Sequence, residues 1–229
     1  MTASLSSNRP QDVSGFGFDR DALPAAGPDG RAVIDVQSFF GFPPDAPDAG
    51  GGRRPLELEI GSGKGTFLAQ QAPLQPGTDF LGVEIAKPFW RHAADRARRL
   101  ALRNVRLLWH DGEAFVRVHC PDGAFQKVHL YFPDPWPKDR HHKRRSFQEP
   151  FLREVHRVLA PGGTMHVATD HEGYFAWMEE HAERVADAFE RRPFVPPASA
   201  GPGELVGTNF ERKYIPEGRR FQGMILSRL

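Results

Sequence analysis

The sequence predicts an α/β fold in which a mostly parallel sheet is covered by helices on both faces. Strand-like and helix-like segments alternate from Arg53 onward, and glycine-rich or acidic residues follow the strands. The composition, 39% apolar and 26% charged, is that of an ordinary globular protein. A length of 229 residues fits one main domain with an appendage. We therefore expect a flexible amino-terminal arm over residues 1–52 and one domain over residues 53–229.

The individual elements follow from local patterns. Short apolar runs bounded by turn residues predict strands at 56–60, 79–84, 105–109, 125–132, 164–169 and 220–227. Amphipathic spacing predicts helices at 66–72, 88–102, 112–119, 147–159 and 174–191. Pro88 suits a first helical turn, and Pro161-Gly162-Gly163 is expected to close the fourth of these helices.

The first 52 residues contain six prolines and eight glycines with little periodicity, which is typical of a linker. The exception is Val33–Phe42, whose aromatic side chains are expected to dock the arm on the domain. The single cysteine, Cys120, permits no intrachain disulfide. No stretch approaches the ~18 apolar residues of a membrane helix, and the amino terminus lacks the features of a signal peptide. We expect a cytoplasmic protein.

The charge is distributed unevenly. The net charge of +1 hides a net −4 over residues 1–50, where three arginines face seven aspartates. Two segments are strongly basic: residues 91–103 carry five arginines against Asp95, and residues 136–145 carry five cations against Asp139. The second of these segments is suited to contacts with phosphates, with a solvated turn as the alternative.

A glycine-rich loop, Gly61-Ser62-Gly63-Lys64-Gly65, follows the first strand of the expected domain. It is not a phosphate-binding P-loop, because Lys64 is followed by glycine rather than serine or threonine, and it fits the dinucleotide fingerprint poorly. Acids lie at the ends of the neighbouring strands: Glu59, Glu84, Asp111 and Asp134. An acid about 20 residues beyond such a loop, as Glu84 is, can hold the two hydroxyls of a ribose.

Four carboxylates would repel a pyrophosphate but suit a ligand that carries a sulfonium and an ammonium group. S-adenosylmethionine is such a ligand. The alternative for each acid is a loop carboxylate that stabilises a helix N-terminus.

The end of the fourth strand is the most informative segment. Asp134 lies between Pro133 and Pro135 and next to Trp136, so the backbone is stiff and the carboxylate is held beside an aromatic surface. This arrangement suits a planar base, and the basic residues that follow could contact phosphates. Adjacent histidines without suitably spaced carboxylates rarely bind a metal, and we expect none.

Seven motifs together resemble a known family: EIGSGKG, GVE, HDG, YFPDPWPKDRHHKRR, LAPGG, ATD and TNFERK. They are similar to those of the bacterial tRNA (guanine-N7)-methyltransferases of the TrmB type, over about three quarters of the chain. The resemblance implies a Rossmann-like class I methyltransferase fold. It also implies methyl transfer from S-adenosylmethionine to N7 of guanosine 46 in the variable loop of tRNA.

The resemblance also implies roles for individual residues. The cofactor site would comprise Glu59, Gly61, Gly63, Glu84, Asp111 and Asp134, with Asp134 also catalytic. The tRNA or its guanosine would contact Lys138, Arg140, His141, His142, Lys143, Arg144, Arg145, Asp170, Thr208, Asn209, Phe210 and Glu211. The acidic arm departs from the basic amino-terminal segment of many relatives, which puts any contribution of the arm to tRNA binding in doubt.

Two other functions remain open from the residues alone. A methyltransferase acting on an exocyclic amino group of a base could use the same acid-proline-aromatic motif. A non-catalytic RNA-binding module of this fold is a further alternative, although RNA binding alone does not require the cofactor acids. Nothing in the sequence indicates an obligate protein partner.

Overall fold

The computed structural model describes residues 10–41 and 53–229, and its central feature is an eight-stranded sheet. The strand order is β1-β4-β3-β2-β5-β6-β8-β7, and every pairing from β1 to β6 is parallel, whereas β8 runs antiparallel to both of its neighbours. The strands are β1 (Gly17–Asp19), β2 (Leu56–Ile60), β3 (Asp79–Glu84), β4 (Val105–Trp109), β5 (Phe125–Tyr131), β6 (Leu159–Thr169), β7 (Phe189–Pro193) and β8 (Gln222–Arg228).

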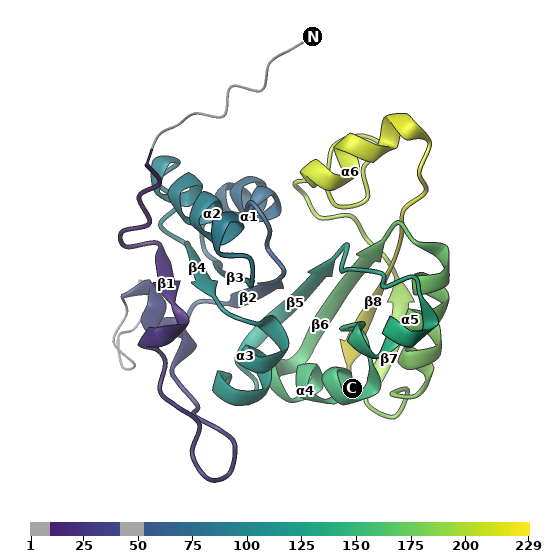
Figure 1. The fold of residues 1–229 in the computed structure, drawn as a ribbon, viewed down its shortest axis with the longest axis horizontal. Helices are drawn as coiled ribbons and strands as arrows, with labels where there is room; N and C mark the ends of the chain where they lie inside the picture. Colours follow the sequence, from purple (N-terminus) through teal and green to yellow (C-terminus); the bar gives the residue numbers. More distant parts are fainter. Residues whose placement is uncertain (1–9, 42–52) are drawn as a thin grey trace.

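Helices cover both faces of this sheet, as the sequence predicts (Figure 1). The α-helices are α1 (Thr66–Gln71), α2 (Lys87–Arg99), α3 (Gly112–His119), α4 (Glu149–Val158), α5 (Glu172–Glu183) and α6 (Asn209–Tyr214). The 3₁₀ segments are η1 (Arg20–Ala22), η2 (Val36–Phe40), η3 (Ala72–Leu74), η4 (Asp139–Arg144) and η5 (Ile215–Glu217). Within the described ranges, every helix is too short or too polar to span a membrane.

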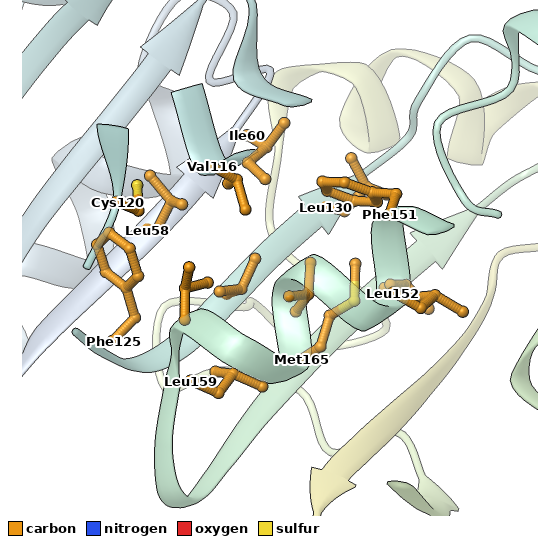
Figure 2. Close-up of a cluster of buried hydrophobic side chains, with 14 of the residues drawn as sticks. Leu58, Ile60, Val116, Cys120, Phe125, Leu130, Phe151, Leu152, Leu159 and Met165 are labelled. Carbon is orange, nitrogen blue, oxygen red and sulfur yellow. The ribbon is translucent and has the colours of Figure 1, made fainter. Parts of the chain in front are cut away.

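Two hydrophobic cores stabilise the two faces. The larger contains side chains of α3, α4 and α5 against the sheet, and the smaller contains those of α1 and α2. Figure 2 shows part of the larger core, where Leu58 and Leu130 of the sheet lie among side chains from the helices, including Val116 and Leu152. The only cysteine, Cys120, is fully buried in this core, and burial raises the pKa of its thiol.

The amino-terminal segment packs on the domain over its described part. The sequence correctly predicts that aromatic residues dock it, because Phe39 and Phe40 are buried in the larger core; Phe42 lies outside the described residues. The short strand β1 was not predicted. It pairs in parallel with β4, and the backbone of Gly17 comes so close to α2 that an added Cβ would lie 3.0 Å from Trp90.

The carboxyl-terminal part differs most from the sequence prediction. A single helix was expected over 174–191, but α5 ends at Glu183 and the residues that follow form β7 at the sheet edge. The backbone of β7 has its ladder partners in β8, a tertiary interaction that the local pattern cannot reveal. Likewise Pro161-Gly162-Gly163, expected to close a helix, lies within β6. The last strand is inserted in the sheet, as expected; it lies between β6 and β7 and starts two residues later than predicted.

Candidate active site

A pocket of about 810 Å³ opens at the carboxyl ends of the central strands. It lies where the chain reverses its direction across the sheet, because β3 and β4 extend the sheet on one side of β2 and β5 and β6 on the other. Ligands of open α/β sheets bind at such points. The pocket is lined by nine of the predicted site residues: Glu59, Gly61, Gly63, Glu84, Asp111, Asp134, Thr208, Asn209 and Phe210.

Glu84 joins the glycine loop to the end of β3. Its Oε2 accepts a hydrogen bond from the backbone N–H of Gly63 (2.7 Å), and its Oε1 accepts one from the N–H of Ala86 (2.7 Å). Gly61 and Gly63 have φ angles of 73° and 54°, a region in which other side chains are strained. This loop conformation directs a backbone N–H at the carboxylate. Each oxygen of Glu84 keeps a second lone pair for a ligand hydroxyl.

Glu59 is a buried carboxylate without a complete set of partners. It lies at the pocket wall with 4% of its surface exposed, and its Oε2 has no hydrogen-bond partner among the described residues. Burial and the neighbouring Glu84 raise the pKa of Glu59 well above its ordinary value. A cationic ligand group in the pocket would relieve both effects and restore the charged form.

A buried polar network supports the wall of the pocket beneath Glu59. The imidazole of His129 contacts Glu57 through Nε2 (2.9 Å) and the hydroxyl of Tyr131 through Nδ1 (2.8 Å), and Lys127 donates to Glu57 (2.8 Å). Although burial opposes ionisation, His129 and Lys127 lower the pKa of Glu57 to about 2. An ionised carboxylate only accepts hydrogen bonds, so Nε2 of His129 carries a proton in this pair. The network fixes the ring of Tyr131, which lines the pocket.

The two remaining acids occupy different environments. Asp111 caps α3 by accepting a hydrogen bond from the N–H of Ala114 (2.8 Å), which is the structural role weighed for it, and it also lines the pocket. Asp134 is exposed at the pocket rim. The residues on either side of its Pro-Asp-Pro run, Phe132 and Trp136, have φ angles of 53° and 43°, which are rare outside glycine. Strained backbone of this kind is concentrated at functional sites.

The basic segment forms η4, directly after the strained loop. The side chains of Arg140, Lys143 and Arg144 are exposed, and Arg144 lies over the ring of Trp136 at 4.9 Å. The two histidines are partly buried: His141 lies edge-on to Trp136 and His142 edge-on to the ring of Trp177.

The structure corrects the role expected for Arg145. Its side chain is buried, its guanidinium lies over the rings of Tyr174 (4.9 Å) and Trp177 (5.0 Å), and its Nε donates to the carbonyl of Pro135 (2.9 Å). These contacts leave it inaccessible to an RNA phosphate. Arg145 instead anchors the loop that carries Asp134 to the helix α5.

Like Arg145 and the residues of η4, the predicted substrate residues Lys138 and Asp170 lie outside the pocket lining. Lys138 is exposed and precedes η4, and Asp170 forms an ion pair with Arg219 (2.5 Å). Both follow strands that end beside the pocket, β5 and β6 respectively. Their predicted contacts with tRNA stay predictions.

Helix α6, from the carboxyl-terminal part of the chain, forms one wall of the pocket. Thr208 caps this helix, Asn209 is exposed, and the ring of Phe210 stacks on Phe132 with centroids 5.0 Å apart. Thr208, Asn209 and Phe210 thus line the pocket beside the strained loop.

Glu211 does not have the base-reading role expected from the sequence. Its side chain is fully buried, and its carboxylate accepts hydrogen bonds from the backbone N–H groups of Leu205, Val206 (2.9 Å) and Gly207 (2.8 Å). Because the carboxylate is fully buried and lies outside the pocket lining, it is not accessible to guanine. Glu211 holds the loop 205–207 against α6.

Sequence reasoning missed several residues of the pocket, among them Phe89, Tyr131 and Lys213. Phe89 lies in the first turn of α2 with 46% of its surface exposed. A large apolar residue directly after a strand end and a helix-starting proline is a usable signal for a pocket rim. Lys213 follows the recognised Thr-Asn-Phe-Glu run, but nothing local distinguishes it from a solvated lysine.

Comparison with known proteins agrees with this geometry. A family model described as "Putative methyltransferase" matches residues 53–219. The tRNA (guanine-N(7)-)-methyltransferase of Alkalilimnicola ehrlichii is 40% identical over 185 residues, which are 79% of this chain and 75% of the relative. That of Halorhodospira halophila is 38% identical over 200 residues, 85% of this chain and 80% of the relative. The solved structure of 16S rRNA methyltransferase KamB aligns with a TM-score of 0.54 at 18% identity, covering 76% of this chain and 86% of that one.

The sheet with its antiparallel β8 and the acidic pocket at the point of strand reversal define a class I methyltransferase. The fold class predicted from the sequence is confirmed. Within this class the chain belongs to the tRNA (guanine-N(7)-)-methyltransferase family, which confirms the resemblance.

Proposed function

We propose that this protein transfers a methyl group from S-adenosylmethionine to N7 of guanosine 46 in the variable loop of tRNA. The observation that carries the proposal is the buried Glu59 carboxylate, whose Oε2 has no hydrogen-bond partner among the described residues and which lies beside Glu84 in the pocket of a protein from this family. A cationic cofactor would supply the partner that Glu59 lacks and would offset the repulsion between the two acids.

The residues present fit S-adenosylmethionine. Glu84 offers free lone pairs to ribose hydroxyls, the backbone of Gly61 and Gly63 is unshielded by side chains, and Glu59 offers an acceptor to a positively charged group. When bound, the cofactor supplies an electrophilic methyl group on a sulfonium. The exposed aromatic rings of Phe89 and Phe210 at the rim could stack on a planar base.

The chemistry expected of the pocket requires no strong base. N7 of guanine carries a lone pair and no proton, so a nucleophile does not have to be generated. The purine gains positive charge as its N7 reacts. The carboxylate of Asp134, held at the pocket rim between two prolines, can stabilise this charge and orient the base. Arg145 acts through the backbone, by fixing the carbonyl of Pro135 next to that carboxylate.

The test is methylation of bulk tRNA from cells that lack this modification. The wild-type protein should produce 7-methylguanosine in hydrolysed tRNA, located at position 46 by cleavage chemistry specific for that nucleoside. Asp134→Asn should reduce kcat on the order of 10²-fold while changing tRNA affinity little, because the lost charge matters most in the transition state. Asp139→Asn is the matched control, since it removes an exposed carboxylate five residues away.

Other outcomes identify the alternatives. A methylated exocyclic amine in the hydrolysate would show that the pocket acts on a different atom of the base. Binding of tRNA without methyl transfer would indicate a non-catalytic RNA-binding module. Equal, small effects of Asp134→Asn on rate and affinity would remove the catalytic role of Asp134.

A further inference from the structure

A stripe of basic side chains lies along one side of α2, outside the segment assigned to RNA above. We define this α2 stripe as His92, Arg96 and Arg99. They are spaced by four and three residues, so they project from the same side of the helix as Phe89, which lines the pocket. The stripe therefore begins at the pocket rim and continues away from it.

Arg96 is the centre of this stripe. It is partly buried, and its Nη1 donates to Oγ1 of Thr66 (3.1 Å), a residue that also lines the pocket. No carboxylate within 4 Å neutralises Arg96 in the part of the chain that the structure describes. Burial, Arg99 and Arg212 of α6 all lower the pKa of Arg96, which places two further guanidinium groups near it.

The acids nearby compensate only part of this charge. Arg99 pairs with Asp95 (2.9 Å), and Asp95 also pairs with Arg98 (3.2 Å). Arg212 pairs with Glu204 (2.5 Å). These pairs leave Arg96 without a counterion among the described residues. Lys64 of the glycine loop adds a further charge near His92. The pKa of His92 is lowered by burial and by the charges of Lys64, Arg96 and Arg99.

The stripe lies on the opposite side of the pocket from η4. Helix α2 follows β3 and packs in the smaller core with α1, whereas η4 follows β5 and is attached through Arg145 to α5 on the face of the larger core. The pocket is between them, because Phe89 and Trp136 both line it. Clustered cations raise the energy of the isolated protein through mutual repulsion, and a polyanion removes that repulsion.

We propose that the α2 stripe is a second binding surface for the sugar-phosphate backbone of tRNA, so that the RNA is held on both sides of the pocket. The proposal rests on the proposed function, since it takes tRNA as the substrate. The partner is defined by its chemistry: an RNA whose phosphates lie on both sides of the nucleotide in the pocket. Binding on two sides would hold that nucleotide over the pocket without any base-specific contact from α2.

The experiment compares two double variants of the full chain. Arg96→Gln with Arg99→Gln removes two charges from the stripe and leaves Asp95 paired with Arg98. Arg91→Gln with Arg103→Gln removes the same charge from exposed positions outside the stripe: Arg91 projects about 80° and 140° around α2 from Arg99 and Arg96, and Arg103 lies between α2 and β4. The dissociation constant of tRNA is measured for both, and for the wild type, over a range of salt concentrations.

The stripe variant should bind tRNA more weakly, and the slope of log affinity against log salt should fall by about 1.4–1.8, the value for two lost phosphate contacts. Its KM for tRNA should rise with little change in kcat. The control variant should keep the wild-type slope. Arg96→Lys with Arg99→Lys should also keep most of it, because the charges remain, whereas a packing defect would weaken binding here too.

Three results would overturn the proposal. The first is an unchanged slope in the stripe variant. The second is an equal loss of slope in the control variant, which would show a nonspecific effect of net charge. The third is a joint fall of melting temperature, S-adenosylmethionine affinity and tRNA affinity in both the stripe variant and the lysine variant, which would show a packing defect. If the wild type methylates tRNA and one of these three results is found, the proposed function stands and only the second binding surface is refuted. If the wild type does not bind tRNA, the proposed function and the second binding surface are both refuted.

Discussion

Replacing Glu211 by glutamine separates a structural role from a base-reading role. In the wild type the carboxylate accepts three backbone N–H groups, from residues 205 to 207. Glutamine has a single acceptor oxygen, and its amide group directs two N–H donors at whichever backbone donor the oxygen does not reach. The charge that strengthens all three hydrogen bonds is also lost.

The magnitude follows from these contacts. One hydrogen bond to a charged group contributes ~1.5–3 kcal/mol, and a buried donor left without a partner costs ~1–3 kcal/mol. Because the remaining two bonds partly survive, we expect a loss of about 2–4 kcal/mol in the free energy of unfolding. For a domain of this size, 1 kcal/mol lowers the melting temperature by roughly 2–4 °C, so the expected decrease is about 5–15 °C.

The assay is thermal unfolding followed by circular dichroism, together with limited proteolysis across residues 199–214. Glu217→Gln is the matched control, because that side chain is largely exposed at the end of the same segment. The expected result is a lower melting temperature or faster cleavage for Glu211→Gln alone. If neither changes while kcat/KM for tRNA falls, Glu211 contacts the substrate and the structural reasoning is refuted.

Three further predictions concern other buried charges. Arg145→Gln should lower both the melting temperature and the turnover rate, since it removes two cation–π contacts of ~0.5–2 kcal/mol each and the hydrogen bond to the carbonyl of Pro135. Arg140→Gln, at an exposed position, should leave both unchanged when rates are measured at saturating tRNA. The pKa of Glu59 is raised in the folded state, so the contribution of Glu59 to stability is present below its ordinary pKa of 4.5 and is lost as pH rises. Glu59→Gln should therefore raise the melting temperature of the ligand-free protein at pH 8 and weaken S-adenosylmethionine binding in calorimetry. A lower melting temperature would contradict this. Glu57 has a lowered pKa of about 2, so it stabilises the fold above pH 4.5 and loses this effect as pH falls towards 2; urea unfolding at several pH values should show Glu57→Gln less stable than wild type at pH 7 and the difference shrinking below pH 4.5.

Six of the eight strands, and the place of the pocket at the carboxyl ends of the parallel strands, could be predicted from the sequence. Apolar runs such as Leu56–Ile60 are separated by turns and helices, and the acids after them necessarily meet at one edge of a parallel sheet. Such predictions depend on periodicity along the chain, which is a local property. They give the positions of Glu59 and Glu84 correctly, because the backbone of each residue is placed by the end of its strand.

The direction of a side chain after it leaves the backbone could not be predicted. Arg145 belongs to a run of exposed cations, and only Tyr174 and Trp177, about thirty residues further on, make it a buried anchor. Glu211 lies in a polar run, but its carboxylate turns back to a loop that precedes it by four to six residues. In both cases tertiary contacts decide between substrate binding and structure.

The burial of Cys120 makes the protein suitable for site-specific labelling. It is the only thiol of the chain, and its position in the core together with its raised pKa keeps the reactive thiolate away from reagents. Cysteines introduced at the exposed positions Lys213 and Lys143 would therefore be the accessible sites of modification. Fluorophores placed there, one on each side of the pocket, would report in real time whether α6 and η4 approach each other when cofactor and RNA are added.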